Sequence, residues 1–285
     1  MPKYPFLAML RPNNWIKNFF IFVPLFFAGD VFNLNKLTNT GLSFVLFCMI
    51  ASSVYILNDI VDREHDRQHQ KKKFRPIASG QISVHTALIT FLIIICSTFI
   101  LSFIFIPKII PLLLIYLILN LAYSYYLKNI AIVDILTISL FYLIRLLIGG
   151  AAINITISAW LILCTIFISL FLITGKRIAE FNQETGRKVL SGYTSEFLQG
   201  FLFMSATLSI ISYSLYIVLV LNSNLAIYTI FFVILGIMRY SYIILTTHKS
   251  EYPEQVIISD KIILISGGCW IILMYIIFYL NGFLG

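Results

Sequence analysis

Long apolar stretches separated by short polar segments recur along almost the whole chain. A membrane-spanning helix needs about 20 mainly apolar residues. Such stretches fall at about 15–33, 39–57, 84–106, 109–127, 131–152, 157–175, 197–221, 225–246 and 261–283. Within them the apolar residues are continuous or follow a helical period, which argues against an outer-membrane barrel of alternating strands. The pattern predicts an all-α polytopic membrane protein, with nine transmembrane helices in a single domain over residues 1–285.

Composition agrees with a membrane protein. With 60% hydrophobic and 11% charged residues, and a mean hydropathy of +0.94, the chain has too little polar surface for a water-soluble globule. The first twelve residues contain no apolar run followed by a small-residue cleavage site, so we expect no cleavable signal peptide. Small residues on the helix faces permit a homo-oligomer.

The basic residues predict the orientation of the helices. If the N-terminus is inside, only Lys36 and Lys108 fall outside and Arg145 and Arg239 fall within spans, so 16 of the 20 Lys and Arg residues are inside. The positive-inside rule then predicts an N-in, C-out topology, with cytoplasmic loops at about 58–82, 176–196 and 247–260. All acids except Asp30 share that face, so we expect a cytoplasmic site. Because the net charge of +8 is spread over many helix flanks, we expect no nucleic-acid partner.

The segment Asn58–Gly80, after the second predicted span, carries the strongest chemical signal. If the helix continues, Asp59, Asp62 and Asp66 lie at i, i+3 and i+7 and form one stripe on its surface. Three like charges so placed repel one another. A magnesium ion, held with waters and substrate phosphates, relieves that repulsion.

A structural interpretation of the same stripe is a solvated helix end whose acids pair with Arg63 and Arg67. The basic residues that follow, among them Lys72, Lys73 and Arg75, instead favour a metal–diphosphate complex with cationic side chains closing over it. The lysines also fit a positive-inside anchor of the helix.

The motif NDxxDxxxD, followed by RPIASG, resembles the first aspartate-rich motif of the UbiA-type intramembrane prenyltransferase superfamily. The resemblance implies a Mg²⁺ cofactor with Asp59, Asp62 and Asp66 as catalytic metal ligands. Aromatic prenyltransferases of the superfamily carry a second motif, DxxxD, after helix 6. Here that segment reads TGKRIAEFNQETG, in which only Glu180 and Glu184 could imitate the acidic pair.

Five segments together resemble the decaprenyl-phosphate phosphoribosyltransferase branch of that superfamily. They lie at 11–18 (RPNNWIKN), 123–129 (YSYYLKN), 143–150 (LIRLLIGG), 175–180 (GKRIAE) and 239–264. The branch implies transfer of 5-phosphoribosyl from phosphoribosyl diphosphate (PRPP) to a polyprenyl phosphate, with release of pyrophosphate, in the bacterial plasma membrane. The alternative enzyme moves an isoprenoid from a prenyl diphosphate to an aromatic or other small acceptor.

The substrate-binding residues that we expect are polar or aromatic residues at the inner ends of the helices, together with one arginine inside a span. They are Asn14, Lys17, Asn58, Lys72, Lys73, Arg75, Tyr123, Tyr126, Lys128, Arg145, Lys176, Arg177 and Glu180. The lysines can instead snorkel to the interface, and the tyrosines can form an interfacial belt. Because Arg145 lies well inside a span, it requires a partner on another helix or a bound phosphate.

Two further features have a structural interpretation. We expect Arg239 to pair with Glu180 or Asp260, and Gly149–Gly150 to allow close helix packing. A transporter or channel, in which Arg145 and Arg239 line a pathway, is a different class. The outer face has almost no polar residues for a second gate, which argues against transport.

Overall fold

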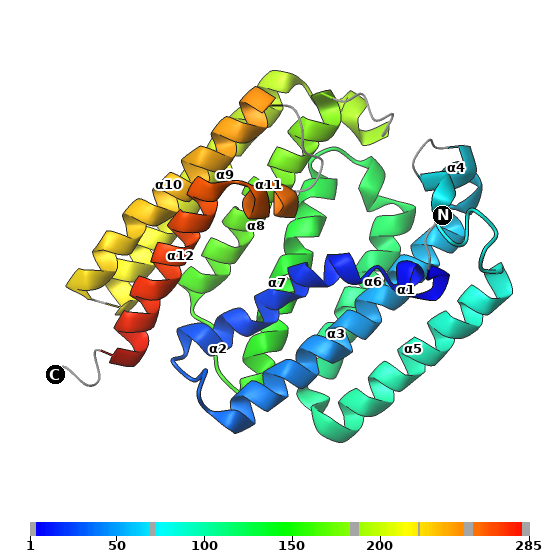
Figure 1. The fold of residues 1–285 in the computed structure, drawn as a ribbon, viewed down its shortest axis with the longest axis horizontal. Coiled ribbons are helices and arrows are strands. Elements are labelled where there is room, and N and C mark those ends of the chain that lie inside the picture. The colour runs from blue at the N-terminus through cyan, green and yellow to red at the C-terminus, as the bar shows by residue number, and fades with distance from the viewer. Residues whose placement is uncertain (1–3, 69–71, 183–187, 222, 248–252, 281–285) are drawn as a thin grey trace. The chain divides into compact units, whose positions relative to one another are not determined.

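The computed structural model describes residues 4–68, 72–182, 188–221, 223–247 and 253–280, and within these ranges it is helical without a β-strand (Figure 1). Eight of the described helices are long and apolar enough to cross a membrane. The prediction of an all-α, multi-pass membrane protein is therefore confirmed. The chain forms two compact units, Met1–Ser124 with Ile144–Thr156, and Tyr125–Leu143 with Ile157–Gly285.

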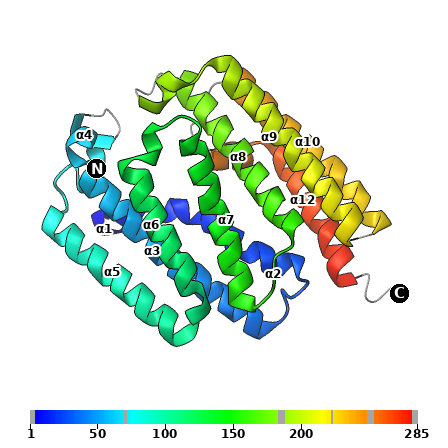
Figure 2. The same cartoon turned by 180° about the vertical axis from the view of Figure 1, so that it is seen from behind.

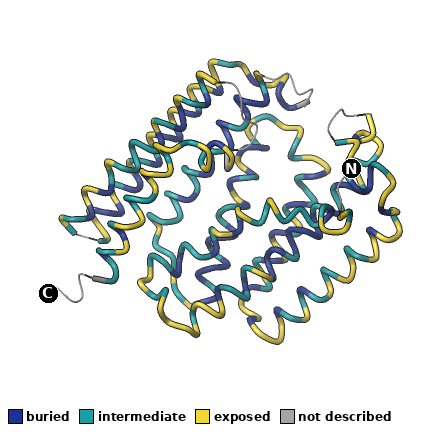
Figure 3. Tube along the Cα trace, in the orientation of Figure 1, coloured by how far each residue is buried: buried dark blue, intermediate teal, exposed yellow. Residues whose placement is uncertain are grey.

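The first unit is built around one long, mostly buried helix. Its elements are α1 (Pro5–Leu10), the 3₁₀ helix η1 (Pro12–Phe22), α2 (Val23–Phe27), α3 (Leu34–Val61), α4 (Arg63–Gln68), η2 (Lys72–Phe74), α5 (Val84–Phe105), η3 (Pro107–Ile109) and α6 (Ile110–Tyr125). α3 packs against α1, η1 and α5 and is the more buried helix, whereas α5 is largely exposed (Figure 3). Beyond His85 and Thr86 in its first turn, the exposed side chains of α5 are apolar, as expected for a helix that faces lipid.

The first predicted span, 15–33, is not one long α-helix. Arg11 adopts a left-handed conformation with φ of 52°, and Pro12 then starts the 3₁₀ helix η1, which passes into α2 at Val23. Gly29, with φ of 73°, ends this run in a turn. Eleven 3₁₀ residues and five α-helical residues rise about 30 Å together, close to the hydrocarbon thickness of a bilayer. The ninth crossing and the N-in, C-out orientation stay predictions.

The second unit is a bundle of long helices. Its elements are η4 (Leu127–Asn129), α8 (Ala159–Asn182), η5 (Lys188–Gly192), α9 (Ser195–Tyr216), the π-helical η6 (Ile217–Leu221), α10 (Asn224–Thr247), α11 (Pro253–Ser259), α12 (Lys261–Tyr275) and the π-helical η7 (Ile276–Leu280). α9 packs on α8 and α10, and α12 packs on α10; these neighbours lie side by side in both views (Figures 1 and 2). The core cluster includes Phe171, Leu198 and Tyr240.

Helix α7 (Val133–Ile153) contributes its first half to the second unit and its second half to the first. Within the first unit, α7 approaches η1 at Gly149. A Cβ atom at Gly149 would collide with the carbonyl oxygen of Ile21. The prediction that this glycine permits close packing of helices is confirmed.

Candidate functional site

Two buried carboxylates of the first unit share one arginine. Asp59, in the last turn of α3, and Asp66, in α4, are only 2% and 1% exposed. Nη1 of Arg75 donates to Oδ1 of Asp59 at 3.0 Å and to Oδ2 of Asp66 at 2.6 Å. Nη2 of Arg11 donates to the same Asp59 oxygen, and the Arg11 guanidinium lies 5.2 Å from the ring centroid of Tyr55. We call Arg11, Asp59, Asp66 and Arg75 the first ion cluster; its two negative and two positive charges balance.

The chain after α4 folds back so that Arg75 reaches these acids. The backbone N–H of Arg75 donates to the carbonyl of Lys72 at 2.9 Å, and Nε of Arg67 donates to the carbonyl of Ala78 at 3.2 Å. Ile77 is buried in an apolar cluster with residues of α1 and α3. Burial of this short apolar sequence anchors the turn. Arg75, directly before it, is thereby held beside the carboxylates.

The helix that carries the three predicted acids is interrupted at Asp62. α3 ends at Val61, Asp62 caps it with φ of −85° and ψ of 3°, and α4 begins at Arg63. The expectation of a continuous helix is therefore wrong at this one residue, although the backbone N–H groups of Asp62 and Asp66 still donate to the carbonyls four residues earlier, at 2.9 and 2.8 Å. The stripe of three carboxylates stays a prediction. Across the part of the chain that the structure describes, no three His, Cys, Asp or Glu side chains are grouped closely enough to hold a metal ion.

Asp59 and Asp66 alone nevertheless fit magnesium. Mg²⁺ in proteins is usually held by one or two carboxylates, with waters and substrate phosphates completing its octahedron. Both carboxylates already contact a single cationic atom, Nη1 of Arg75. Oxygen ligands that converge on one positive charge are the donor set that a hard divalent cation requires.

Arg145, on the part of α7 in the first unit, is buried with a neutral partner and two aromatic rings. Its Nε donates to Oδ1 of Asn18, on η1, at 2.9 Å. The guanidinium carbon lies 4.8 Å from the ring centroid of Phe47 and 5.6 Å from that of Tyr116, within cation–π range. Arg145 therefore has a partner on another helix, which is one of the two alternatives that its position inside a span predicts.

In the second unit, Arg177 on α8 is completely buried between two acids. Its Nε donates to Oδ2 of Asp134 at 2.7 Å, and its Nη1 donates to Oε2 of Glu180 at 2.5 Å. The other Asp134 oxygen accepts a hydrogen bond from the hydroxyl of Tyr193 at 2.5 Å. Nζ of Lys176 lies 3.7 Å from Oε1 of Glu180. We call these five residues the second ion cluster, in which two acids balance two bases.

Tyr193 is held in place by a second contact. Its hydroxyl accepts a hydrogen bond from the backbone N–H of Ile132 at 2.6 Å. Burial, and then the hydrogen bond to Asp134, raises the pKa of Tyr193 above its ordinary value of 10.0. The hydroxyl therefore stays protonated at neutral pH and remains a donor to Asp134.

Six of the predicted site residues lie in the two ion clusters: Asp59, Asp66, Arg75, Lys176, Arg177 and Glu180. Asn58 accepts a hydrogen bond from Ser124 at 2.5 Å. Two of the other predicted residues are exposed, Lys73 and Tyr126. Five are half-buried: Asn14, Lys17, Lys72, Tyr123 and Lys128. Nη2 of Arg239 donates to Oδ2 of Asp260 at 2.9 Å, so Arg239 pairs with one of its two predicted partners. Glu184 lies outside the described residues.

Sequence reasoning missed three residues that organise these sites: Arg11, Asp134 and Tyr193. An available signal was Asp134, because an acid at the edge of an apolar span needs a partner. The other two carry no comparable signal. Arg11 and Asp59 are 48 residues apart, and Asn18 and Arg145 are 127 apart, so no local spacing connects them.

Comparison with known proteins agrees with this architecture. The UbiA prenyltransferase family matches residues 18–259, and the chain therefore belongs to that family. It is 36% identical over 216 residues to a decaprenyl-phosphate phosphoribosyltransferase of Mycobacterium tuberculosis, covering 73% of this chain and 72% of that protein. The Corynebacterium glutamicum protein of the same name is 33% identical over 288 residues, which is 96% of this chain and 86% of the relative. The fold is similar to that of a UbiA homologue from Archaeoglobus fulgidus bound to DMAPP and Mg²⁺, with a TM-score of 0.74 and 17% identity over 96% of this chain and 99% of that one.

Proposed function

We propose that the protein is a Mg²⁺-dependent transferase that moves 5-phosphoribosyl from PRPP to a polyprenyl phosphate and releases pyrophosphate. The observation that carries this proposal is Lys176, 30% exposed beside the buried Arg177, in the segment where the resemblance places the second pair of aspartates of prenyltransferases that act on aromatic acceptors. A donor with an additional phosphate, and an acceptor that is itself a phosphate, require more cations. Relatives that are 33–36% identical to this chain are named for this reaction, which supports the assignment.

In this proposal the first ion cluster binds the diphosphate of PRPP through magnesium. Asp59 and Asp66 hold the ion, and Asp62, at the helix break, is a third candidate ligand. When bound there, Mg²⁺ would supply positive charge to neutralise the charge that develops on the leaving pyrophosphate. Arg75, which contacts both carboxylates, would donate its hydrogen bonds to the diphosphate once the carboxylates held the ion. Arg11 continues to balance Asp59.

The reaction needs no dedicated general base. The bond between ribose C1 and the diphosphate oxygen breaks, and its electron pair leaves with pyrophosphate. A phosphate oxygen of the lipid then forms the new bond to C1. A phosphate monoester has a second pKa of about 6, so this oxygen is already largely ionised at pH 7. The chain therefore contributes binding, orientation and charge neutralisation.

The remaining basic residues bind and orient the two phosphorylated substrates. We assign Lys72 and Lys73 to PRPP, and Lys17, Lys128 and Arg145 to the ribosyl phosphate and the lipid phosphate together. The active face is cytoplasmic, in the plasma membrane of a bacterium. The distribution of Lys and Arg residues and the bacterial origin of the relatives support this location.

The proposal is tested by product identification. Purified full-length protein is incubated with MgCl₂, PRPP and decaprenyl phosphate, and in parallel with MgCl₂, a prenyl diphosphate and an aromatic acid. Lipids are then identified by mass spectrometry. We expect a phosphoribosylated lipid and pyrophosphate in the first reaction, and neither product when EDTA replaces MgCl₂.

Two results would overturn the proposed function. A prenylated acid in the second reaction, with no product in the first, would assign the chain to prenyl transfer. No product in either reaction, with substrate flux across proteoliposomes, would assign it to transport.

A further inference from the structure

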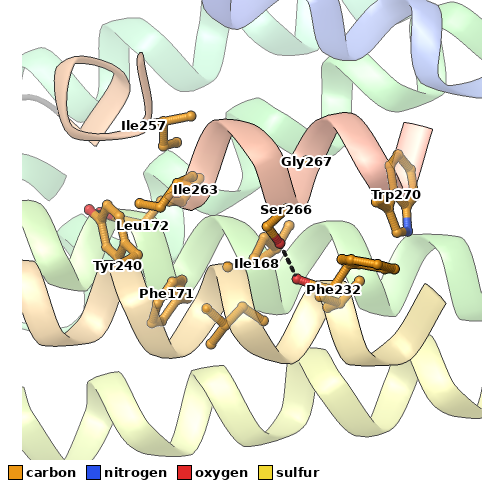
Figure 4. Close-up of a pocket in the computed structure, with 13 residues that line it drawn as sticks. Ile168, Phe171, Leu172, Phe232, Tyr240, Ile257, Ile263, Ser266, Gly267 and Trp270 are labelled. Carbon is orange, nitrogen blue, oxygen red and sulfur yellow. Dashed lines mark hydrogen bonds between the residues drawn. The ribbon is translucent and has the colours of Figure 1, made fainter. Parts of the chain in front are cut away.

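The second unit contains an apolar cavity of about 250 Å³ between α8, α10 and α12, with α11 at one end (Figure 4). Its walls are mainly aliphatic and aromatic, and include Phe171, Leu172 and Phe232. The polar groups in the lining are already hydrogen-bonded. Ser266 donates to the carbonyl of Phe232 at 2.5 Å, and Nε1 of Trp270 donates to Tyr213 at 2.7 Å. The cavity therefore presents hydrocarbon to any occupant.

Glycines leave this space open. A Cβ atom built at Gly267, on α12, would meet nothing within 4 Å, and one at Gly236, on α10, would meet only Ser266 Oγ at 3.5 Å. The lining residues of α12 run from Ile263 to Trp270, about 10 Å along the helix axis. Gly267 is exposed on the surface of a membrane-spanning helix, so the opening faces lipid.

Because the cavity is open towards lipid, its size limits the part of an occupant that it holds. Water does not fill an apolar cavity, and a cavity of about 150 Å³ holds benzene, which has six carbon atoms. In proportion, about 250 Å³ holds roughly ten carbons, which corresponds to two isoprene units.

A cation lies one turn beyond the cavity on the same face of α8. Leu172 lines the cavity, and Lys176 follows it at i+4, about 6 Å along the axis. The Lys176 side chain is 30% exposed. Between them, Gly175 allows Tyr240 to close over the helix, because a Cβ atom there would lie 2.7 Å from the tyrosine hydroxyl. An apolar cavity with a partly exposed ammonium group one helical turn beyond its end is complementary to an isoprenoid chain with a phosphate head.

We propose that this cavity binds the phosphate-proximal isoprene units of the polyprenyl phosphate acceptor, with Lys176 as the counter-ion of its phosphate. The inference rests on the proposed function for the identity of the lipid. The cavity determines where the acceptor chain lies, and α12 supplies the residue that controls its entry, Gly267.

A matched pair of glycine variants tests the proposal. Gly267→Leu fills the cavity from α12, whereas Gly268→Leu, at the next position, lies outside the lining and also has nothing within 4 Å of its Cβ atom. Binding of farnesyl phosphate to each full-length protein is measured by native mass spectrometry. We expect at least about a tenfold weaker Kd in Gly267→Leu, because excluding even two methylene groups from burial costs that factor. Gly268→Leu should stay within about twofold of the wild-type Kd.

Two further arms define the ligand. Lys176→Gln should weaken the binding of farnesyl phosphate but not of farnesol, which lacks the phosphate. Phosphatidylglycerol at equal concentration should fail to displace farnesyl phosphate from the wild-type protein; displacement would make the cavity a site for bilayer lipid and overturn the proposal. If Gly267→Leu does not fold, Gly236→Val fills the same cavity from α10.

An unchanged Kd in the cavity-filling variants would also overturn the proposal. Failure of the proposed function can be distinguished from failure of the proposed lipid site. A wild-type protein that binds farnesyl phosphate in this cavity but never transfers phosphoribosyl would retain the site and refute the reaction. A Gly267→Leu variant with normal transfer and an unchanged KM for the lipid would retain the reaction and refute the site.

Discussion

Replacing Asp134 by Asn should destabilise the second unit strongly, although the two side chains have nearly the same shape. Asp134 is completely buried, and its two oxygens bind the guanidinium of Arg177 and the hydroxyl of Tyr193. The variant leaves a buried arginine with only part of its compensating charge. Removing one partner of a buried pair costs about 3–5 kcal/mol. At about 2–4 °C per kcal/mol for a unit of this size, Tm should fall by at least about 6 °C.

The assay is thermal unfolding of the purified protein in one detergent, followed by tryptophan fluorescence. Tyr193→Phe is the matched control, because it removes one hydrogen bond of Asp134 and leaves the charge pair intact; it should cost about 1–2 kcal/mol. The double variant Asp134→Asn with Arg177→Gln should lose less stability than the sum of the two single variants. A Tm for Asp134→Asn within about 2 °C of wild type, or simple additivity in the double variant, would refute the view that this pair stabilises the bundle.

Two further predictions concern packing and pH. Gly149→Ala should cost about 1–3 kcal/mol, because the new Cβ atom collides with the carbonyl of Ile21, whereas Gly41→Ala, with nothing within 4 Å, should not lower Tm; equal effects in thermal scans would contradict the close packing. The hydrogen bonds from Arg239 hold the pKa of Asp260 below its ordinary value of 3.8. The stability that follows from a lowered pKa is present above pH 3.8 and is lost as the pH falls through the folded-state value. Asp260→Asn, which keeps the N-cap, should therefore lower Tm slightly at pH 7 and not at all at strongly acidic pH, because an exposed ion pair stabilises only weakly. A Tm difference independent of pH would count against the pair.

Hydropathy predicted most of the helices because a helix that crosses a membrane must be apolar over the thickness of the bilayer. The predicted span 84–106 corresponds to α5, Val84–Phe105, and 131–152 corresponds to α7, Val133–Ile153. The prediction stopped too early at α8, which continues from the predicted end at 175 to Asn182. Charged residues lower the hydropathy there, but Arg177 and Glu180 neutralise each other within the helix, so the helix continues.

Sequence reasoning was weakest where the structure depends on backbone geometry or distant pairing. Hydropathy does not distinguish a 3₁₀ helix from an α-helix, so η1 was expected to be an ordinary span. The aspartate motif predicted a metal site from spacing alone, and the break at Asp62 could not be seen in that spacing. The two ion clusters depend on partners such as Arg11 and Tyr193, which the fold brings in from other elements.

The most direct test of the central claim is Mg²⁺-dependent phosphoribosyl transfer by three carboxylate variants. Asp59→Asn and Asp66→Asn remove the buried acids that we assign to the metal. Glu64→Gln removes an exposed acid of the same segment, paired only with Arg63 and Arg67 among the contacts described. We expect kcat/KM to fall at least about 100-fold in the first two variants, as for loss of a principal electrostatic group, and to stay near wild type in the third. Near-normal transfer by both Asp59→Asn and Asp66→Asn, in folded protein, would contradict the account.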